Sequence, residues 1–123
     1  EFVGNKLLKD RFQLISHVSH KGLTEYYNNA ALFSLPSRDD EAFGLVYLEA
    51  MACNLPVVAP DDENRRALIG EAGFLGDVKD SEIYRDLLKK SLQTDFGNKP
   101  REQAEKFSWE RIGEKYEKVF GEY

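Results

Sequence analysis

The sequence predicts an α/β fold in which a parallel sheet carries helices on both faces. Short apolar runs alternate with longer helical patterns along the chain, as they do in proteins built from strand–helix units. Residues 55–59 are apolar throughout and rich in β-branched side chains, which is typical of a central parallel strand. With 123 residues, the chain has the length of one domain. These features predict three or four parallel strands in a Rossmann-like arrangement.

Local patterns place the elements in chain order. The expected elements are a helix end at 2–10, a strand at 12–15, a helix at 22–30, a strand at 31–35, a helix at 43–53, a strand at 55–59, a short helix at 65–69, a small strand at 74–75 and helices in the remainder. The helix at 22–30 is predicted because one face would carry Leu23, Tyr26, Tyr27 and Ala30. The helix at 43–53 is apolar nearly all round, so we expect it to be buried.

Several helix ends carry signals of their own. Asn54 follows the apolar helix, and asparagine often adopts the left-handed conformation that ends a helix. Asp80 or Ser81 can cap a helix that runs to about residue 92. Pro100 suits the first turn of the next helix.

The terminal helix is expected at 108–121, with Ser108 as its cap and Trp109 as a packing anchor. Its apolar stripe consists of Ile112, Tyr116, Val119 and Phe120. We expect this stripe to pack against, or cross towards, another domain of the same protein.

The composition argues against several classes of protein. A net charge of -5 disfavours nucleic acid and anionic membranes as main partners. The single cysteine, Cys53, allows no intrachain disulfide, so we expect a reducing, cytoplasmic setting and a core position for its thiol. No run of 18 apolar residues is present. His17 and His20 have no further histidine or cysteine near them in the sequence, so we expect no metal site.

Glu49 is the one ionisable residue in the apolar helix. A buried carboxylate costs several kcal/mol unless it has partners. Glu49 therefore either points out at the helix edge, pairs with an arginine, or faces a polar ligand such as the two hydroxyls of a ribose. A carboxylate accepts two hydroxyl donors well.

The start of the same helix is a second candidate feature. Gly44 follows a polar loop, and glycine at a helix amino terminus lets a phosphate approach the free backbone amides. Gly44 can also simply fit a tight turn between strand and helix. Glu41 lies in that loop, either as an ordinary exposed acid or as a ligand for sugar hydroxyls.

One stretch carries a resemblance to a known family. From Pro36-Ser37 through Glu41, Phe43-Gly44 and Glu49-Ala-Met-Ala to Pro56-Val-Val, the sequence resembles retaining glycosyltransferases of the GT-B fold, family 4. Seven residues separate the two glutamates, which is the E-x7-E signature of that family. The segment from Phe107 to Glu110 is similar to the family's closing segment, so the resemblance covers residues 12–116.

The resemblance implies a function for the site. The whole protein would transfer a hexose from a UDP- or GDP-sugar to an acceptor with retention of configuration, without a metal or other cofactor. Glu41 would be the catalytic residue in contact with the hexose, and Glu49 would bind the donor ribose. Phe43 and Gly44 would offer backbone groups to the sugar, while the amides of Leu45 and Val46 would bind the diphosphate.

The resemblance also implies what lies elsewhere. Residues 1–123 would form part of the C-terminal donor-binding domain, without its first βα unit. The family's donor-side Arg and Lys and its acceptor-binding domain lie upstream of the matched segment, so we expect the isolated chain to be inactive. Membrane association of the whole enzyme is not encoded here.

The sequence departs from the family at three places, and two other classes stay open. Ala42 and Asn54 stand where the family usually has glycine, and residues 61–66 replace its usual Gly pair and Pro-Glu, which puts donor contacts from that loop in doubt. The main alternative is a non-catalytic nucleotide- or sugar-binding module of the same fold. A receiver-like signalling domain is a more distant one, because no lysine follows a strand.

Overall fold

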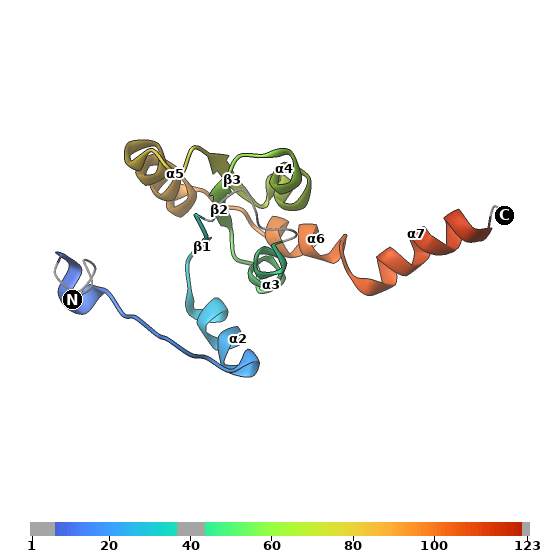
Figure 1. Ribbon diagram of the computed structural model, residues 1–123, viewed down its shortest axis with the longest axis horizontal. Helices are drawn as coiled ribbons and strands as arrows, with labels where there is room; N and C mark the ends of the chain where they lie inside the picture. The colour runs from blue at the N-terminus through green and yellow to red at the C-terminus, as the bar shows by residue number, and fades with distance from the viewer. Residues whose placement is uncertain (1–6, 37–43, 122–123) are drawn as a thin grey trace.

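The computed structural model describes residues 7–36 and 44–121, and in these ranges it contains a three-stranded parallel sheet. The strands β1 (Phe33–Ser34), β2 (Val57–Pro60) and β3 (Gly73–Gly76) lie in the order β1-β2-β3, with β2 in the centre (Figure 1). Val57 pairs with Phe33 on one side and with Gly73 on the other. The predicted α/β fold is confirmed. The described residues form three of the three or four strands that the sequence predicts.

The other regular elements of the described chain are helices and short 3-10 turns. They are η1 (Lys9–Arg11), α2 (His20–Asn29), α3 (Leu45–Ala52), α4 (Glu63–Ile69), η2 (Gly70–Ala72), α5 (Ser81–Gln93), α6 (Lys99–Glu105) and α7 (Trp109–Gly121). Asp80 caps α5 through the amides of residues 82 and 83, and Pro100 lies in the first turn of α6, as the sequence predicts.

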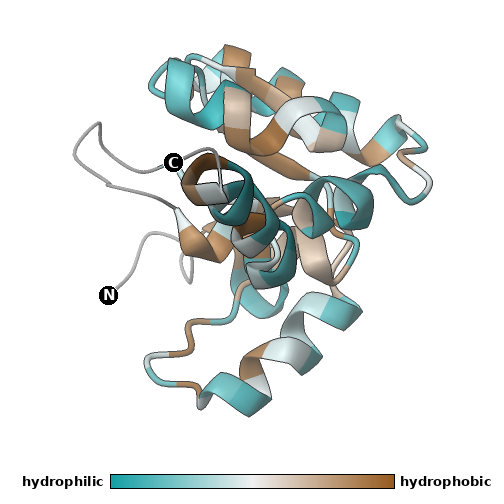
Figure 2. Ribbon diagram, turned by 90° about the vertical axis from the view of Figure 1, so that its right-hand side faces the viewer, coloured by the Kyte–Doolittle hydropathy of each residue, from teal (hydrophilic) through white to brown (hydrophobic). Residues whose placement is uncertain are grey.

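Alternate residues of each strand face opposite sides of the sheet, and both sides are covered. Val57 and Ala59 belong to the main core, in which α3 and α4 contribute Tyr47, Met51, Leu68 and Ile69. On the opposite face, the hydroxyl of Ser34 lies 2.6 Å from the hydroxyl of Tyr84 on α5. The predicted helices on both faces are therefore confirmed, and Figure 2 shows hydrophilic and hydrophobic bands alternating along helices of the molecule.

The predicted burial of the apolar helix α3 is limited to three of its residues, Tyr47, Ala50 and Met51. The helix ends as predicted. Asn54 adopts the left-handed conformation with φ of 61°, and the amide of Leu55 donates to the carbonyl of Ala50 at 3.1 Å. The side chain of Asn54 also donates to the carbonyl of Gly97 at 2.9 Å and accepts from the amide of Arg101 at 3.2 Å. One asparagine therefore ends α3 and binds the start of α6, and this second role was not predicted.

The predicted strand at 12–15 is wrong. These residues have no strand assignment, and they run away from the sheet in Figure 1. A strand needs a neighbouring strand to accept and donate its backbone hydrogen bonds, and none lies beside this segment in the described chain. Leu14 and Ile15 are consequently exposed. At the predicted helix end, residues 1–6 lie outside the described residues, and the described residues 7–8 are helical and lead into η1.

The predicted apolar face of α2 is only partly buried. Tyr27 is 8% exposed, whereas the neighbouring Tyr26 is 49% exposed. Ala30 is also exposed, and it follows the last residue of the helix. The i, i+3, i+4 pattern identified the correct helix, but it did not distinguish between the two tyrosines.

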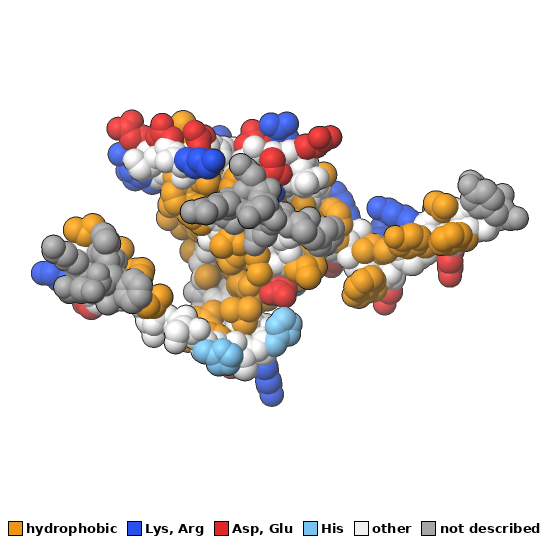
Figure 3. Space-filling view, in the orientation of Figure 1, with side chains coloured by type: hydrophobic (Ala, Val, Ile, Leu, Met, Phe, Trp, Pro, Cys, Tyr) orange, Lys and Arg blue, Asp and Glu red, His pale blue; other side chains and the backbone are white. Residues whose placement is uncertain are grey.

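Ser108 precedes the terminal helix α7, and its hydroxyl accepts from the amide of Arg111 at 3.3 Å, as predicted for a cap. The helix extends away from the sheet in Figure 1, and hydrophobic side chains line it in Figure 3. Trp109 is 87% exposed, so its predicted role as a packing anchor is wrong for the described chain. That the stripe packs on another domain stays a prediction. Among residues 7–36 and 44–121, no helix combines the length and apolar character needed to cross a lipid bilayer.

Candidate functional site

The candidate site lies where two parallel strands end and the next helices begin. β1 is followed by Leu35 and Pro36, and β2 is followed by Asp61 and Asp62. In open parallel sheets, the carboxyl ends of the strands are where ligands bind. The start of α3 belongs to this edge, because the hydroxyl of Tyr47 donates to the carbonyl of Leu35 at 3.0 Å.

Gly44 begins α3 in a conformation that favours glycine. Its φ of 65° and ψ of 46° lie in the left-handed region. A Cβ at this position would lie 2.5 Å from Cδ2 of Tyr47, which is too close for any real contact. The glycine is therefore required for two separate reasons, the backbone conformation and the space taken by the tyrosine ring.

The first turn of α3 is open to a ligand. No side chain caps the helix, so its first amides have no partner of that kind among the described residues. Leu45 is 62% exposed and Val46 is partly exposed. An uncapped helix amino terminus presents backbone donors and the positive end of the helix dipole. This arrangement can bind an anion without a lysine or an arginine.

Tyr47 anchors this turn to the sheet and to α4. Its buried ring packs edge-on against Phe33 at a centroid distance of 5.9 Å. The guanidinium of Arg65 lies over the same ring, 5.9 Å from its centroid. The positive charge of Arg65 therefore lies close to the start of α3, but it contacts the Tyr47 ring.

Asp62 holds Arg65 in this place. Its carboxylate caps α4 by accepting from the amide of Arg65 at 2.8 Å, and it also forms an ion pair with the Arg65 guanidinium. Burial alone would raise the pKa of the Asp62 carboxyl, but the hydrogen bonds and charge of Arg65 outweigh that effect and lower it. The segment 61–66, which includes the start of α4, therefore contributes the ion pair Asp62–Arg65, in which the two charges neutralise each other.

Glu49 is the fifth residue of α3, about one turn after Leu45 and about 7.5 Å along the helix axis from Gly44. It is half-buried, and the hydroxyl of Tyr27 donates to its Oε2 at 3.4 Å. No basic residue of the described ranges forms an ion pair with it, and Arg38 lies outside those ranges, so the arginine-paired interpretation stays a prediction. Burial first, and then the charge and hydrogen bond of Glu49, raise the pKa of Tyr27 to about 12.

The structure brings together four of the predicted site residues on one helix: Gly44, Leu45, Val46 and Glu49. Glu41 and Phe43 lie outside the described residues, so their predicted roles stay predictions. Sequence reasoning placed Tyr27 on a packing face and did not connect it with Glu49, since 22 residues separate the two. It also passed over Tyr47, although a tyrosine in an apolar helix has a hydroxyl that needs a partner.

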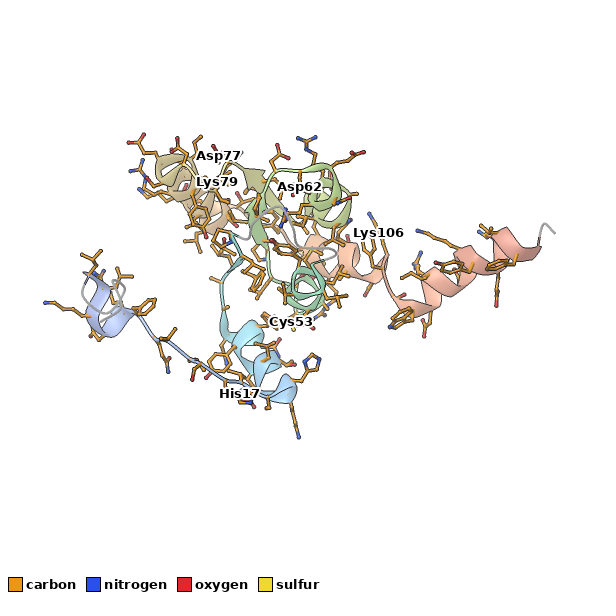
Figure 4. The ribbon with its side chains drawn as sticks, in the orientation of Figure 1. His17, Cys53, Asp62, Asp77, Lys79 and Lys106 are labelled. Atoms are coloured by element: carbon orange, nitrogen blue, oxygen red, sulfur yellow. The ribbon has the colours of Figure 1, made fainter. Side chains whose placement is uncertain are left out.

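The sequence raised His17 and His20 as metal candidates and predicted no site there. Figure 4 shows His17 at a different part of the chain from Cys53 and Asp62. Over the part of the chain that the structure describes, no group of three or more His, Cys, Asp or Glu side chains can hold a metal ion. Cys53 is partly buried at the end of α3 and packs against the small cluster around Tyr27.

Comparison with known proteins gives one family. The family described as Glycosyl transferases group 1 matches residues 1–108. The chain is 34% identical over 94% of its length to the exopolysaccharide phosphotransferase SCO2592 of Streptomyces coelicolor. It is 34% identical over 78% of its length to the O-antigen chain mannosyltransferase B of Escherichia coli, and 35% identical over 81% to the D-inositol 3-phosphate glycosyltransferase of Corynebacterium jeikeium.

These relatives are much longer than the chain. The chain spans 13% of the first protein, 26% of the second and 25% of the third. No solved structure matches the chain.

Proposed function

The chain belongs to the family Glycosyl transferases group 1, and from this premise we propose that it forms the donor site of a hexosyltransferase. The donor is a UDP- or GDP-sugar, and the hexose passes to an acceptor with retention of configuration. The acceptor-binding part and the transfer reaction itself belong to the whole protein, which is cytoplasmic and uses no metal. The isolated chain is inactive in this proposal.

The observation that carries the proposal is the build of α3. Its first turn is glycine-started, uncapped and partly exposed, and the same helix presents one half-buried carboxylate further along. A nucleoside diphosphate has an anionic diphosphate next to a ribose with two hydroxyls. The amides of Leu45 and Val46 complement the first group, and the carboxylate of Glu49 complements the second.

The position of the helix supports the same proposal. Its amino terminus lies at the carboxyl ends of β1 and β2, held there by Tyr47. A diphosphate leaving group gains negative charge as the glycosidic bond breaks, and fixed backbone amides stabilise such charge without reorganising. Glu41 and Phe43 precede this turn directly in the sequence, and the proposal assigns them the contacts to the transferred hexose.

The relatives favour sugar transfer over other uses of the fold. Two of the three names given above denote a mannosyltransferase and a glycosyltransferase. The name of the Streptomyces protein denotes a phosphotransferase, and of the three proteins this is the one of which the chain covers the smallest share. Sugar transfer from a nucleotide donor is the function consistent with the site and with most of these names.

The test uses the full-length protein with UDP-hexoses and GDP-hexoses, and measures release of UDP or GDP with time. We expect release from one of the two classes of donor. Glu49→Gln should raise KM for that donor by about 10-fold or more, since a charge-assisted hydrogen bond contributes about 1.5–3 kcal/mol. Glu82→Gln, an exposed acid on α5, is the matched control and should leave KM unchanged.

Two outcomes would count against the proposal in different ways. Binding of UDP or GDP without release from any donor would favour the non-catalytic nucleotide-binding module. Equal effects of Glu49→Gln and Glu82→Gln would remove Glu49 from the donor site.

A further inference from the structure

We propose that Tyr27 is a positioning residue for the donor site, which fixes the Glu49 carboxylate in the orientation that accepts the ribose hydroxyls. This inference rests on the proposed function. It starts from the hydrogen bond that the Tyr27 hydroxyl donates to Oε2 of Glu49 at 3.4 Å, across 22 residues of sequence. The bond joins α2 to α3, so an element outside the recognised motif sets the geometry of a residue inside it.

The ring of Tyr27 is held rigidly. It is 8% exposed and forms a small core cluster with Ala50 and Leu55. It also packs edge-on against Phe33 of β1, with a centroid distance of 5.8 Å and an interplanar angle of 74°. A ring with two fixed torsions places its hydroxyl at one point, and so it favours one orientation of the glutamate.

The hydrogen-bonding capacity of the two groups fits this role. A tyrosine hydroxyl has a single proton to donate, whereas an ionised carboxylate has two oxygens that accept. The Tyr27 hydroxyl donates to Oε2 of Glu49, so Oε1 can accept a hydrogen bond from a ligand. A separation of 3.4 Å is long for a bond between two oxygens, and such bonds often shorten when a ligand binds.

The hydroxyl remains a donor at every physiological pH. Burial and the neighbouring Glu49 charge raise the pKa of Tyr27 to about 12, so the proton stays on the phenol. The phenol of Tyr27 therefore stays available as a hydrogen-bond donor to the Glu49 carboxyl group.

Tyr26 distinguishes this role from simple packing. It is the adjacent residue on the same helix, it is 49% exposed, and it has the same side chain. If Tyr27 acts through its hydroxyl, Tyr27→Phe alters ribose recognition and Tyr26→Phe does not. A purely structural role for Tyr27 would change stability and leave the preference for ribose intact.

The experiment measures dissociation constants by calorimetry on the full-length protein. The ligands are UDP and GDP, and the 2′-deoxy form of whichever binds. We expect Tyr27→Phe to weaken binding of the ribonucleotide by about 3- to 10-fold, the range for loss of one hydrogen bond. The preference for the ribonucleotide over its 2′-deoxy form should fall by a similar factor. Tyr26→Phe should match the wild type in both measurements.

The double variant checks that Tyr27 acts through Glu49. Glu49→Gln should reduce the ribose preference by itself, and adding Tyr27→Phe should reduce it no further. An unchanged ribose preference in Tyr27→Phe, with the preference lost in Glu49→Gln, would overturn the role of Tyr27 and leave the proposed function standing. Absence of UDP and GDP binding, or a full preference in Glu49→Gln, would overturn the proposed function and this inference with it.

Discussion

Replacing Gly44 by alanine is expected to destabilise the chain more than the same change at either of two other glycines. Gly44 has a φ of 65°, and a new Cβ would lie 2.5 Å from the Tyr47 ring. Gly97 has a φ of 56°, but nothing lies within 4 Å of its Cβ position. Gly113 lies inside α7 with open space around it. The three sites therefore separate backbone strain from steric overlap.

The magnitudes follow from these environments. The left-handed conformation costs a residue with a Cβ about 1–2 kcal/mol, and this term applies to Gly44 and Gly97 alike. Overpacking adds about 1–3 kcal/mol at Gly44, because Tyr47 is buried and its hydroxyl is bonded to Leu35. We therefore expect losses of about 2–5 kcal/mol for Gly44→Ala and about 1–2 kcal/mol for Gly97→Ala. Gly113→Ala should raise the free energy of unfolding by about 0.5–1 kcal/mol, since alanine is the better helix former.

The assay is urea unfolding of the three variants and the wild type, followed by circular dichroism, with the free energy of unfolding obtained by linear extrapolation. The reasoning predicts the order Gly113→Ala, wild type, Gly97→Ala and Gly44→Ala, from most to least stable. A Gly44→Ala variant as stable as Gly97→Ala would show that Tyr47 does not restrict the start of α3.

Three further changes test other contacts. Asn54→Ala should lower the free energy of unfolding by about 2–4 kcal/mol, because alanine disfavours the left-handed conformation and two hydrogen bonds are lost. Asn54→Gly should lower it by about 1–2 kcal/mol less, because glycine adopts that conformation freely. Urea unfolding of both variants compares the two losses. Asp62→Ala should lower the thermal midpoint of unfolding, because it removes a helix cap that contributes about 1 kcal/mol. The wild type should lose this contribution as pH falls through the lowered pKa of the Asp62 carboxyl. A loss of stability of equal size in both proteins at acidic pH would contradict this prediction. Tyr27→Phe should flatten the stability profile above pH 10, measured by unfolding at alkaline pH.

The sign of the Tyr27 effect follows from the direction of its pKa shift. The folded state raises this pKa from 10.0 to about 12, so it binds the phenolic proton more tightly than the unfolded state. The resulting stability is fully present below pH 10 and is lost as pH rises towards 12. Tyr26→Phe should retain the decline of the wild type, and its disappearance in both variants would contradict the assignment.

The sequence predicted the elements whose signals are local. The apolar run at 55–59 identified the central strand, and Asn54 identified the end of α3, because strand burial and a left-handed cap leave marks on neighbouring residues. The pattern at 12–15 is also mostly apolar, with Gln13 as its one polar residue, yet a strand depends on a neighbour that no local pattern reveals.

The sequence predicted the residues of the site that lie on α3, and it did not predict the side chains from other helices that contact them. Gly44 and Glu49 belong to one short segment with a recognisable spacing. Tyr27 and Arg65 reach that segment from α2 and α4, and their contacts exist only once the chain has folded. Both tyrosines of α2 fit the helical pattern, so their exposures of 8% and 49% had to come from the structure.

The most direct test of the donor site is a nuclear magnetic resonance titration of the isotope-labelled chain with UDP and GDP, beside Glu49→Gln. The proposal predicts amide shifts that cluster from Gly44 to Glu49 and weaken in the variant. Shifts that cluster elsewhere, or that are the same in Glu49→Gln, would contradict the assignment of α3 as the donor-binding helix.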